Sequence, residues 1–181
     1  SYNGSEIFVN STKPRPTATT FRLLGRAYAD GEVRLEYAFD DGPAMVERVR
    51  FPGAPSTVPT GRETAFARAL ALLHGVAGVS YYKALVPERI EVVGEPFDPD
   101  LADLLDETWL HGLGEFAHHN DLDLRSRIHF PRGQAPATPA PSLKLPRRAL
   151  VPIGGGKDSL VSIETLKRAG EAFAVVWIGR S

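Results

Sequence analysis

The sequence predicts an α/β fold, and three observations support that prediction. Residues 21–51 alternate apolar and polar side chains on both sides of Asp30-Gly31, which is typical of antiparallel strands joined by a tight turn. Two later stretches carry apolar residues at helical spacing behind helix-start signals. Beyond a proline-rich stretch, the order of apolar run, three glycines, helical segment and apolar run indicates a β-loop-α-β unit.

An antiparallel meander should open the first domain. Residues 1–20 mix Ser, Thr, Asn, Gly and Pro without any period, so we expect them to form a flexible tail. One strand precedes Asp30-Gly31, and a third covers residues 45–51. The strand between them buries one face, because apolar residues occupy alternate positions: Val33, Leu35, Tyr37 and Phe39.

Helices should follow the meander within the same domain. Thr60 and Glu63 have capping-box spacing, so a helix should begin there. Its expected buried face carries Phe66, Leu70, Leu73 and Val76 or Ala77, and Gly75 and Gly78 should loosen its end. A short strand is expected over residues 89–93. Asp98-Pro99 predicts the start of another helix, which we expect to continue with a bend through Gly112 and Gly114 to His119. Residues 21–130 therefore form an α+β N-terminal domain, whose expected role is substrate recognition.

A proline-rich linker should separate this domain from a second one. Five prolines fall within residues 131–148, which favours an extended path over a helix or a sheet. Residues 149–153 and 172–178 then predict two buried parallel strands, joined by a Gly-rich loop and a helix over residues 160–169 that Gly170 ends. Residues 149–181 should therefore begin a second domain.

Composition excludes several classes of function. The 181 residues are 43% hydrophobic and 24% charged, the balance of a folded, soluble protein. The net charge of −1 disfavours a dedicated nucleic-acid binder, so no nucleic-acid partner is expected. The absence of cysteine excludes disulfides, thiol catalysis and Cys-based metal sites. No apolar run is long enough to span a bilayer, so we expect a cytoplasmic protein without a membrane partner.

The loop with three glycines is the strongest chemical signal. Glycines between a strand and a helix let backbone N–H groups approach an anion closely. A Walker A loop is excluded, because Val151 stands where its first glycine belongs and Asp158 follows Gly156-Lys157. A dinucleotide fingerprint is excluded as well, because position 159 is Ser rather than Gly. An ordinary Gly-rich turn is the simplest alternative.

The loop resembles the PP-loop of the ATP pyrophosphatase superfamily, whose usual form is Ser-Gly-Gly-x-Asp-Ser. Gly155, Gly156, Asp158 and Ser159 match, and Gly154 replaces the first Ser. The resemblance implies ATP bound with Mg²⁺, cleavage between the α- and β-phosphates, and an adenylated substrate. It implies that pyrophosphate binds Gly154, Gly155, Gly156, Lys157, Asp158 and Ser159, that Asp158 lies near the metal, and that Trp177 and Ile178 lie against adenine.

Three longer runs resemble the N-terminal part of the UDP-N-acetylmuramoyl-L-alanyl-L-glutamate epimerase (MurL) family. They cover residues 72–83, 112–117 and 151–159, and in this family glycine is expected at the first PP-loop position. The resemblance implies ATP-dependent inversion of the terminal L-Glu of UDP-MurNAc-L-Ala-L-Glu, with release of AMP and pyrophosphate, in peptidoglycan precursor synthesis. Coupling to the ligase that adds L-Glu is a further implied partnership. Family members are much longer, so the 181 residues should hold a truncated PP-loop domain and be inactive by themselves.

Epimerisation needs an acid or base, and the candidates are His118, His119, Lys83, Tyr81, Tyr82 and Glu115. We favour the two histidines, because imidazole titrates in the useful range, and keep Lys83 as a further catalytic candidate. The alternatives are a solvated helix end for the histidines and packing at a domain surface for residues 81–83. Glu115 and His118 also have di-iron spacing, but the further ligands that such a site needs are missing.

Two other functions stay open. Another PP-loop enzyme, such as an amidotransferase-type synthetase or a tRNA-modifying thiolase, would share the loop. The chain could instead act as a non-catalytic binding module through residues 21–130. Because a PP-loop sheet needs several parallel strands and only two are present, residues 149–181 should be weakly held unless they pack on the first domain.

Overall fold

The computed structural model describes residues 17–134, 142–146 and 148–177 of a mixed α/β chain. The predicted tail up to residue 16, the middle of the predicted linker (135–141), Arg147 and the last four residues lie outside the described residues. The chain divides into two compact units, one of residues up to 141 and one of residues from 142 onward. Each unit is described by itself.

The predicted hairpin is confirmed. Strands β1 (Thr20–Ala29) and β2 (Glu32–Phe39) pair in antiparallel register, and β3 (Met45–Arg50) pairs antiparallel with β2. Asp30 and Gly31 both have positive φ, 51° and 75°. Two successive residues in this region give the turn that matches the twist of a two-residue hairpin, and Asp and Gly tolerate it best.

The four-stranded sheet is not a simple meander. Its order is β3-β2-β1-β4, and β4 (Arg89–Val92) lies parallel to β1, with Phe21 opposite Ile90. The short strand was expected from the sequence, but its parallel pairing was not. The connection from β3 to β4 contains a helix of 20 residues, and a long crossover is what allows the last strand to return beside β1.

Helix α1 (Glu63–Tyr82) begins later than a capping box at Thr60 requires. Arg62 is its N-cap residue and makes no capping bond with its side chain, so the predicted capping box is wrong. The reason is local: Gly61 has a φ of +80°, and the N–H of Arg62 donates to the carbonyl oxygen of Pro59 at 3.1 Å. A turn therefore separates Thr60 from the helix.

Gly75 and Gly78 do not loosen the end of α1, as the sequence had suggested; both are buried and the helix continues to Tyr82. A Cβ atom on Gly78 would lie 3.0 Å from the ring of Tyr37. The glycines therefore allow close packing against the sheet and the next helix. The fully buried residues of α1 are Ala71, His74, Gly75, Gly78 and Tyr82. Of the predicted face, Leu70, Leu73 and Ala77 pack partly buried against this core, whereas Val76 is 40% exposed.

Helix α2 (Pro99–Gly112) begins as predicted. The Asp98 carboxylate accepts a hydrogen bond from the N–H of Asp100 at 3.0 Å, and Pro99 occupies the first helical position. Leu113 interrupts the helix, and α3 (Gly114–His119) follows. The predicted bend before His119 is thus confirmed.

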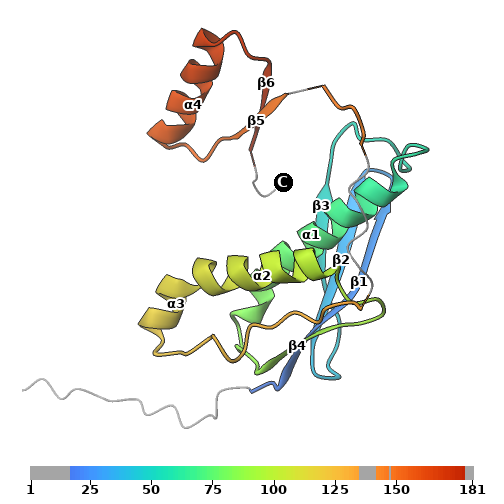
Figure 1. Cartoon of the computed structure of the whole chain (residues 1–181), viewed down its shortest axis with the longest axis vertical. Helices are drawn as coiled ribbons and strands as arrows, with labels where there is room; N and C mark the ends of the chain where they lie inside the picture. Colours follow the sequence, from blue (N-terminus) through green and yellow to red (C-terminus); the bar gives the residue numbers. More distant parts are fainter. Residues whose placement is uncertain (1–16, 135–141, 147, 178–181) are drawn as a thin grey trace, which may run out of the picture. The chain divides into compact units, whose positions relative to one another are not determined.

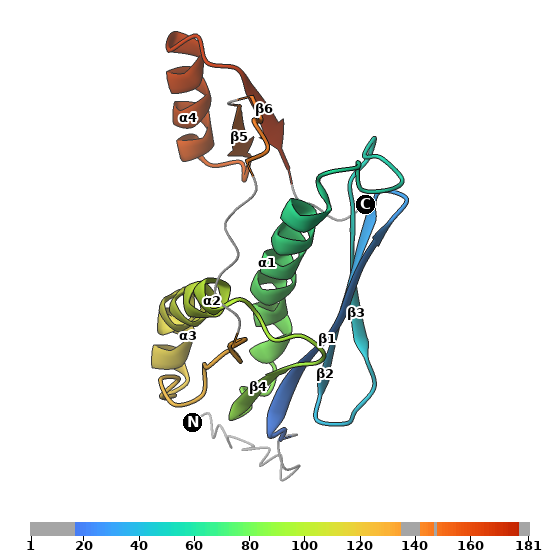
Figure 2. The same cartoon turned by 45° about the vertical axis from the view of Figure 1, so that its right-hand side comes forward.

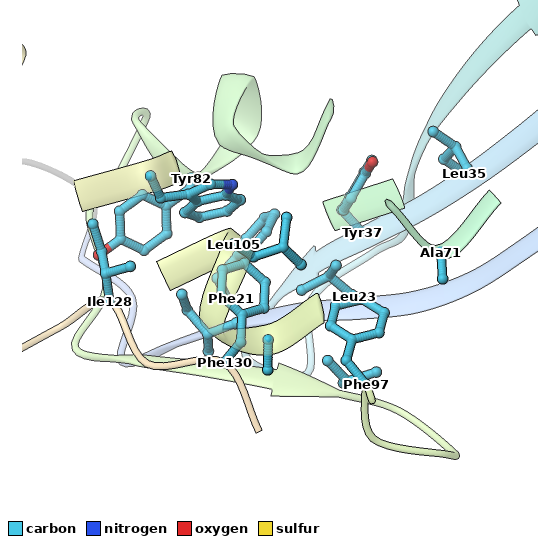
Figure 3. Packing of buried hydrophobic residues seen from close by; sticks show 14 of the residues in the cluster. Phe21, Leu23, Leu35, Tyr37, Ala71, Tyr82, Phe97, Leu105, Ile128 and Phe130 are labelled. Carbon is cyan, nitrogen blue, oxygen red and sulfur yellow. The ribbon is translucent and has the colours of Figure 1, made fainter. Parts of the chain in front are cut away.

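The core of the first unit lies between one face of the sheet and helices α1 and α2. Figures 1 and 2 show α1 beside the strands and α2 running across α1. Figure 3 shows its buried side chains around Phe21. The Phe21 ring stacks on Tyr37 at 5.6 Å and meets Tyr82 edge-on at 5.9 Å. These three residues come from β1, β2 and α1, so one aromatic cluster joins the sheet to the helix.

The second unit contains the predicted β-loop-α-β order. Strands β5 (Ala149–Pro152) and β6 (Phe173–Val176) are parallel, as expected, and α4 (Lys157–Arg168) connects them. The helix begins three residues before the expected Leu160, because Gly156 is extended and acts as the N-cap residue. Gly170, with a φ of 67°, ends it as predicted: its N–H donates to Lys167, and the N–H of Glu171 donates to Leu166.

In the part of the chain that the structure describes, no helix is long and apolar enough to cross a membrane.

Candidate functional site

The Gly-rich loop leaves the sheet at the edge where both parallel strands of the second unit end. Pro152 is paired with Val176, so the loop after β5 and Trp177 after β6 emerge next to one another. The N–H of Ile153 donates to the carbonyl oxygen of Val176 at 2.8 Å, which fixes the start of the loop. Ligands of open α/β sheets bind at this carboxyl edge.

Only one of the three glycines is explained by backbone conformation. Gly155 has a φ of +80°, which favours glycine, whereas Gly154 and Gly156 do not have positive φ. A Cβ atom at any of the three would meet no described atom within 4 Å. Gly156 is the N-cap residue of α4, a position that favours glycine. Neither packing nor conformation accounts for Gly154, and close approach of a ligand to the backbone would.

The side chains of the motif surround the start of α4. Lys157, Asp158 and Ser159 form its first turn rather than the end of the loop, and Lys157 and Asp158 are exposed. No side chain caps the helix, because Gly156 is the N-cap residue, so the N–H groups of the first turn are left to donate hydrogen bonds to an anionic ligand. The Asp158 carbonyl oxygen accepts a hydrogen bond from the Ser162 hydroxyl at 3.0 Å, and none of the described residues makes a hydrogen bond or ion pair with the Asp158 carboxylate.

A Mg²⁺ site at Asp158 would need ligands from elsewhere. Among the described residues there is no group of three or more His, Asp or Glu side chains that could hold a metal ion. Mg²⁺ commonly takes only one or two protein carboxylates and completes its shell with phosphate oxygens and water. A single exposed carboxylate beside a helix start without a side-chain cap fits that mode. The same finding leaves the Glu115–His118 di-iron alternative without further ligands in the described chain.

Of the adenine-contact candidates, Trp177 is 73% exposed immediately after β6. An indole ring exposed to that extent is free to stack on a planar base. Ile178 lies outside the described residues.

The acid–base candidates lie in the first unit, at the ends of two helices. His118 and His119 close α3, with ring centroids 5.8 Å apart, and His119 lies 3.7 Å from the Glu115 carboxylate. His118 lines an open hollow of about 610 Å³ together with His111 and Asp121. Lys83 is exposed at the C-terminal end of α1.

The two tyrosines before Lys83 differ in environment. Tyr82 is fully buried, so its packing at a domain surface is a wrong expectation; its hydroxyl donates to the carbonyl oxygen of Pro87 at 3.1 Å. Burial raises the pKa of Tyr82 to about 12. Desolvation, with a 2.7 Å hydrogen bond to Glu47, raises the pKa of Tyr81 to about 12 as well. Neither phenol is therefore a base at neutral pH.

Sequence reasoning missed a buried polar cluster between β2 and α1. His74 is 1% exposed, its Nε2 lies 3.1 Å from the carbonyl oxygen of Glu36, and its own carbonyl oxygen accepts the Tyr37 hydroxyl at 2.9 Å. Tyr81 stacks on Tyr37 with ring centroids 4.9 Å apart. A signal was available: Tyr37 occupies an inward position of its strand, and a buried phenol hydroxyl needs a partner.

Comparison with known proteins gives a consistent result. The family model described as the MurL N-terminal domain matches residues 12–181. A protein of Xanthomonas oryzae pv. oryzae named UDP-N-acetyl-alpha-D-muramoyl-L-alanyl-L-glutamate epimerase is 49% identical over 165 residues, which cover 90% of this chain and 37% of that protein. Proteins of the same name from Salinispora tropica and a Micromonospora species are 36% and 38% identical, over 89% of this chain. The chain thus spans little more than a third of these relatives. No solved structure matches it significantly.

Proposed function

The chain belongs to the MurL N-terminal domain family, and from this premise we propose that it takes part in epimerising the terminal L-Glu of UDP-MurNAc-L-Ala-L-Glu. In this proposal, ATP activates a carboxylate of that glutamate, and AMP and pyrophosphate are the by-products. The observation that carries the ATP requirement is the run of glycines between β5 and α4, of which Gly154 has no packing or conformational reason to be glycine.

The proposed chemistry answers a specific difficulty. The α-proton of glutamate is barely acidic beside a carboxylate, because its removal places a second negative charge next to the first. Attack of the carboxylate oxygen on the α-phosphorus of ATP releases pyrophosphate and leaves an uncharged acyl group. A base then removes the proton, the acyl oxygen takes up the charge, and a proton returns to the opposite face. Hydrolysis of the acyl phosphate bond gives the D-product and AMP.

The loop residues would bind and orient the phosphates. Backbone N–H groups of residues 154–156 and of the first turn of α4 would donate to phosphate oxygens. Asp158 would hold Mg²⁺, which when bound neutralises the charge of the phosphates and of the departing pyrophosphate. Lys157 would add a cation at the same helix start, and Trp177 would stack on the adenine.

The proton transfers have candidate residues but no assigned one. His118, His119 and Lys83 are exposed, so each is accessible to a substrate. His118 is the first choice, because it lines a hollow, whereas the His119 imidazole already lies near the Glu115 carboxylate. Residues further along the longer relatives could supply the base instead.

The direct test follows the reaction in D₂O. The full-length protein that contains these residues is incubated with ATP, Mg²⁺ and UDP-MurNAc-L-Ala-L-Glu. AMP release together with deuterium at the glutamate α-carbon and a D-Glu product is the expected result. AMP release without α-deuterium would point to another adenylation reaction of a PP-loop enzyme. If neither signal appears with folded protein, the epimerase proposal fails and a binding module becomes the better account.

Two variants connect that assay to the loop. Asp158→Asn keeps the size of the side chain but removes its charge, and we expect AMP release to fall at least a hundredfold. Glu164→Gln is the matched control, because Glu164 is an exposed acid on the same helix, paired only with Lys167 among the described contacts. Gly154→Ala adds a methyl group that no described atom contacts, so lower ATP affinity in this variant would report a phosphate at the backbone.

A further inference from the structure

An apolar hollow in the first unit is not used by the proposed reaction. It lies where the loop after β3 meets the first turns of α1, a region visible beside the sheet in Figure 2. The rings of Tyr28, Phe51 and Phe66 and the side chains of Leu70 and Leu73 line it, and its volume is about 450 Å³. Drug-sized ligands occupy pockets of roughly 300–1,000 Å³ with mainly apolar walls.

The outer wall of this hollow is fixed before any ligand arrives. The Tyr28 hydroxyl donates to the carbonyl oxygen of Pro55, and the N–H of Asp30 donates to the carbonyl oxygen of Ser56 at 2.9 Å. The loop also contains prolines at positions 52, 55 and 59, which restrict its backbone. A wall held by the hairpin and stiffened by proline costs little further ordering on binding.

The ring faces and the charge indicate what would bind. Tyr28 and Phe66 lie with ring centroids 4.9 Å apart at a tilt of 57°. A further aromatic ring can pack against such a pair, either offset-stacked or edge to face. Of the described residues that line the hollow, Arg62 alone carries a charge, and it is exposed at the N-terminal end of α1. A guanidinium beside apolar walls pairs with one anionic group of a ligand whose remainder is apolar.

We propose that this hollow binds a small aromatic anion, with one or two hydrocarbon rings against Tyr28, Phe51 and Phe66 and a single carboxylate or sulfonate paired with Arg62. A pyrimidine base fits the walls poorly, because each of its polar ring atoms would lose hydrogen bonds to water among apolar side chains. The site is therefore distinct from any site for the uridine diphosphate of the proposed substrate, and it does not depend on the epimerase function.

The probes are naphthoate, its neutral analogue naphthalene methanol, and uridine monophosphate. Each is titrated into the ¹⁵N-labelled 181-residue chain, and the amide shifts of residues around the hollow are followed. We expect naphthoate to bind, the neutral analogue to bind about tenfold more weakly, and the nucleotide not to bind. Tenfold is the loss expected for one charge-assisted hydrogen bond.

Matched variants locate the site. Arg62→Gln should weaken naphthoate about tenfold and leave the neutral analogue unchanged, whereas Arg125→Gln, at an exposed arginine of a different hollow, should change neither. Ala69→Phe places a ring in the hollow and should abolish binding. Ala67→Phe is its control, because Ala67 is exposed on the same helix and lines only the neighbouring hollow.

Three results would overturn the proposal. The first is absence of naphthoate binding at millimolar concentration. The second is binding that persists in both folded Arg62→Gln and folded Ala69→Phe. The third is stronger binding of uridine monophosphate than of naphthoate, which would assign the hollow to a nucleotide. The amide spectrum of each variant reports whether it is folded, so loss of binding through unfolding is recognised.

Discussion

The indole Nε1 of Trp109 donates a hydrogen bond to the backbone carbonyl oxygen of Gly75 at a distance of 3.2 Å. Both residues are buried, and the bond joins α2 to α1. The two helices approach closely here because Gly75 has no side chain: a Cβ atom would lie only 2.5 Å from Cδ1 of Leu105. This crossing fixes the position of α2 against α1.

Gly75→Ala should therefore destabilise the protein although alanine favours helix. The gain in helix propensity is about 1 kcal/mol. Forcing a methyl group into a filled core costs about 1–3 kcal/mol, and the upper part of that range, about 2–3 kcal/mol, applies here, because both Cδ atoms of the buried Leu105 would lie 2.5 and 2.8 Å away. We expect a net loss of about 1–2 kcal/mol in the free energy of unfolding, measured by urea denaturation of the 181-residue chain.

Gly112→Ala provides the control for this prediction. Gly112 is the last residue of α2, and a Cβ atom there would meet no described atom within 4 Å. The free energy of unfolding of Gly112→Ala should therefore equal that of the wild type or be slightly higher. Adding Leu105→Val to Gly75→Ala should recover part of the loss, because it removes the contacting atoms. Equal stability of Gly75→Ala and the wild type would mean that the helices separate at little cost.

Substituting Asp106 and substituting Asp103 by alanine should lower the free energy of unfolding by very different amounts, although both residues contact Arg132. Asp106 accepts hydrogen bonds from the N–H of Phe130 and from the Arg132 guanidinium, each at 2.7 Å, and its side chain is only 16% exposed. Asp103 contacts Arg132 from a side chain that is 64% exposed. Asp106→Ala leaves a partly buried donor unsatisfied and should cost about 1–3 kcal/mol.

Asp103→Ala removes an exposed ion pair and should change the free energy of unfolding by less than about 0.5 kcal/mol. Thermal and urea unfolding of the two variants give the comparison directly. A loss of equal size in both would show that the charge on Arg132, rather than the buried bond to Phe130, holds the segment against α2.

These contacts show what sequence reasoning can reach. The hairpin at Asp30-Gly31 and the start of α2 at Asp98 were predictable, because the cause of each lies within a few neighbouring residues. The role of Gly75 was not, because its reason is Leu105, which is 30 positions away in the sequence and contacts it only after folding. Local rules for glycine therefore predicted a loose helix end where, among the described glycines, an added Cβ atom would meet its nearest neighbour at the shortest distance.

The candidate site and its surroundings likewise contain features that the sequence predicts and features that it does not. The Gly-rich loop and the helix that follows it were predictable, since an anion-binding turn is a local structure. The parallel pairing of β4 and the burial of Tyr82 depend on which face of α1 meets the sheet, and that choice follows from distant packing around Phe21. The acid–base candidates are the hardest to rank from the sequence. Which of them reaches a substrate depends on the folded structure, whereas the spacing of residues predicts only local structure.

His74 should make the stability of the first unit depend on pH. Burial lowers its pKa to about 4, against 6.5 for the free side chain. Hydrogen bonding to the Glu36 carbonyl oxygen opposes the shift, and the charge of Arg26 adds to it. Nε2 donates to Glu36, and Nδ1 has no partner among the described atoms, so a second proton would be buried without an acceptor.

The neutral imidazole is thus the form that the folded state favours. The contribution of His74 to stability is complete above about pH 6.5 and is lost as the pH falls toward 4, because the unfolded state then binds the proton more readily. The loss is about 1–3 kcal/mol. Urea unfolding at pH 7.5, 5.5 and 4 should show a steeper decline for the wild type than for His74→Gln. Parallel declines would mean that protonated His74 finds a partner or that water reaches it.

The second unit should open more readily than the first. Its sheet has two strands in the described chain, and Leu150 and Val175 are 66% and 51% exposed. Two paired strands are marginal in water, and of the apolar side chains on β5 and β6 only Val151 is buried in the described structure, whereas β1 and β2 have a full aromatic core behind them. Hydrogen exchange followed by NMR should therefore be at least tenfold faster for the bonded amides of residues 149–153 and 173–176 than for those of β1 and β2.

Equally slow exchange in both sets would contradict this expectation, because it would require further packing on β5 and β6. Repeating the measurement in the full-length protein separates the two cases: if additional strands complete the sheet, protection of residues 149–153 should rise while that of β1 and β2 stays the same.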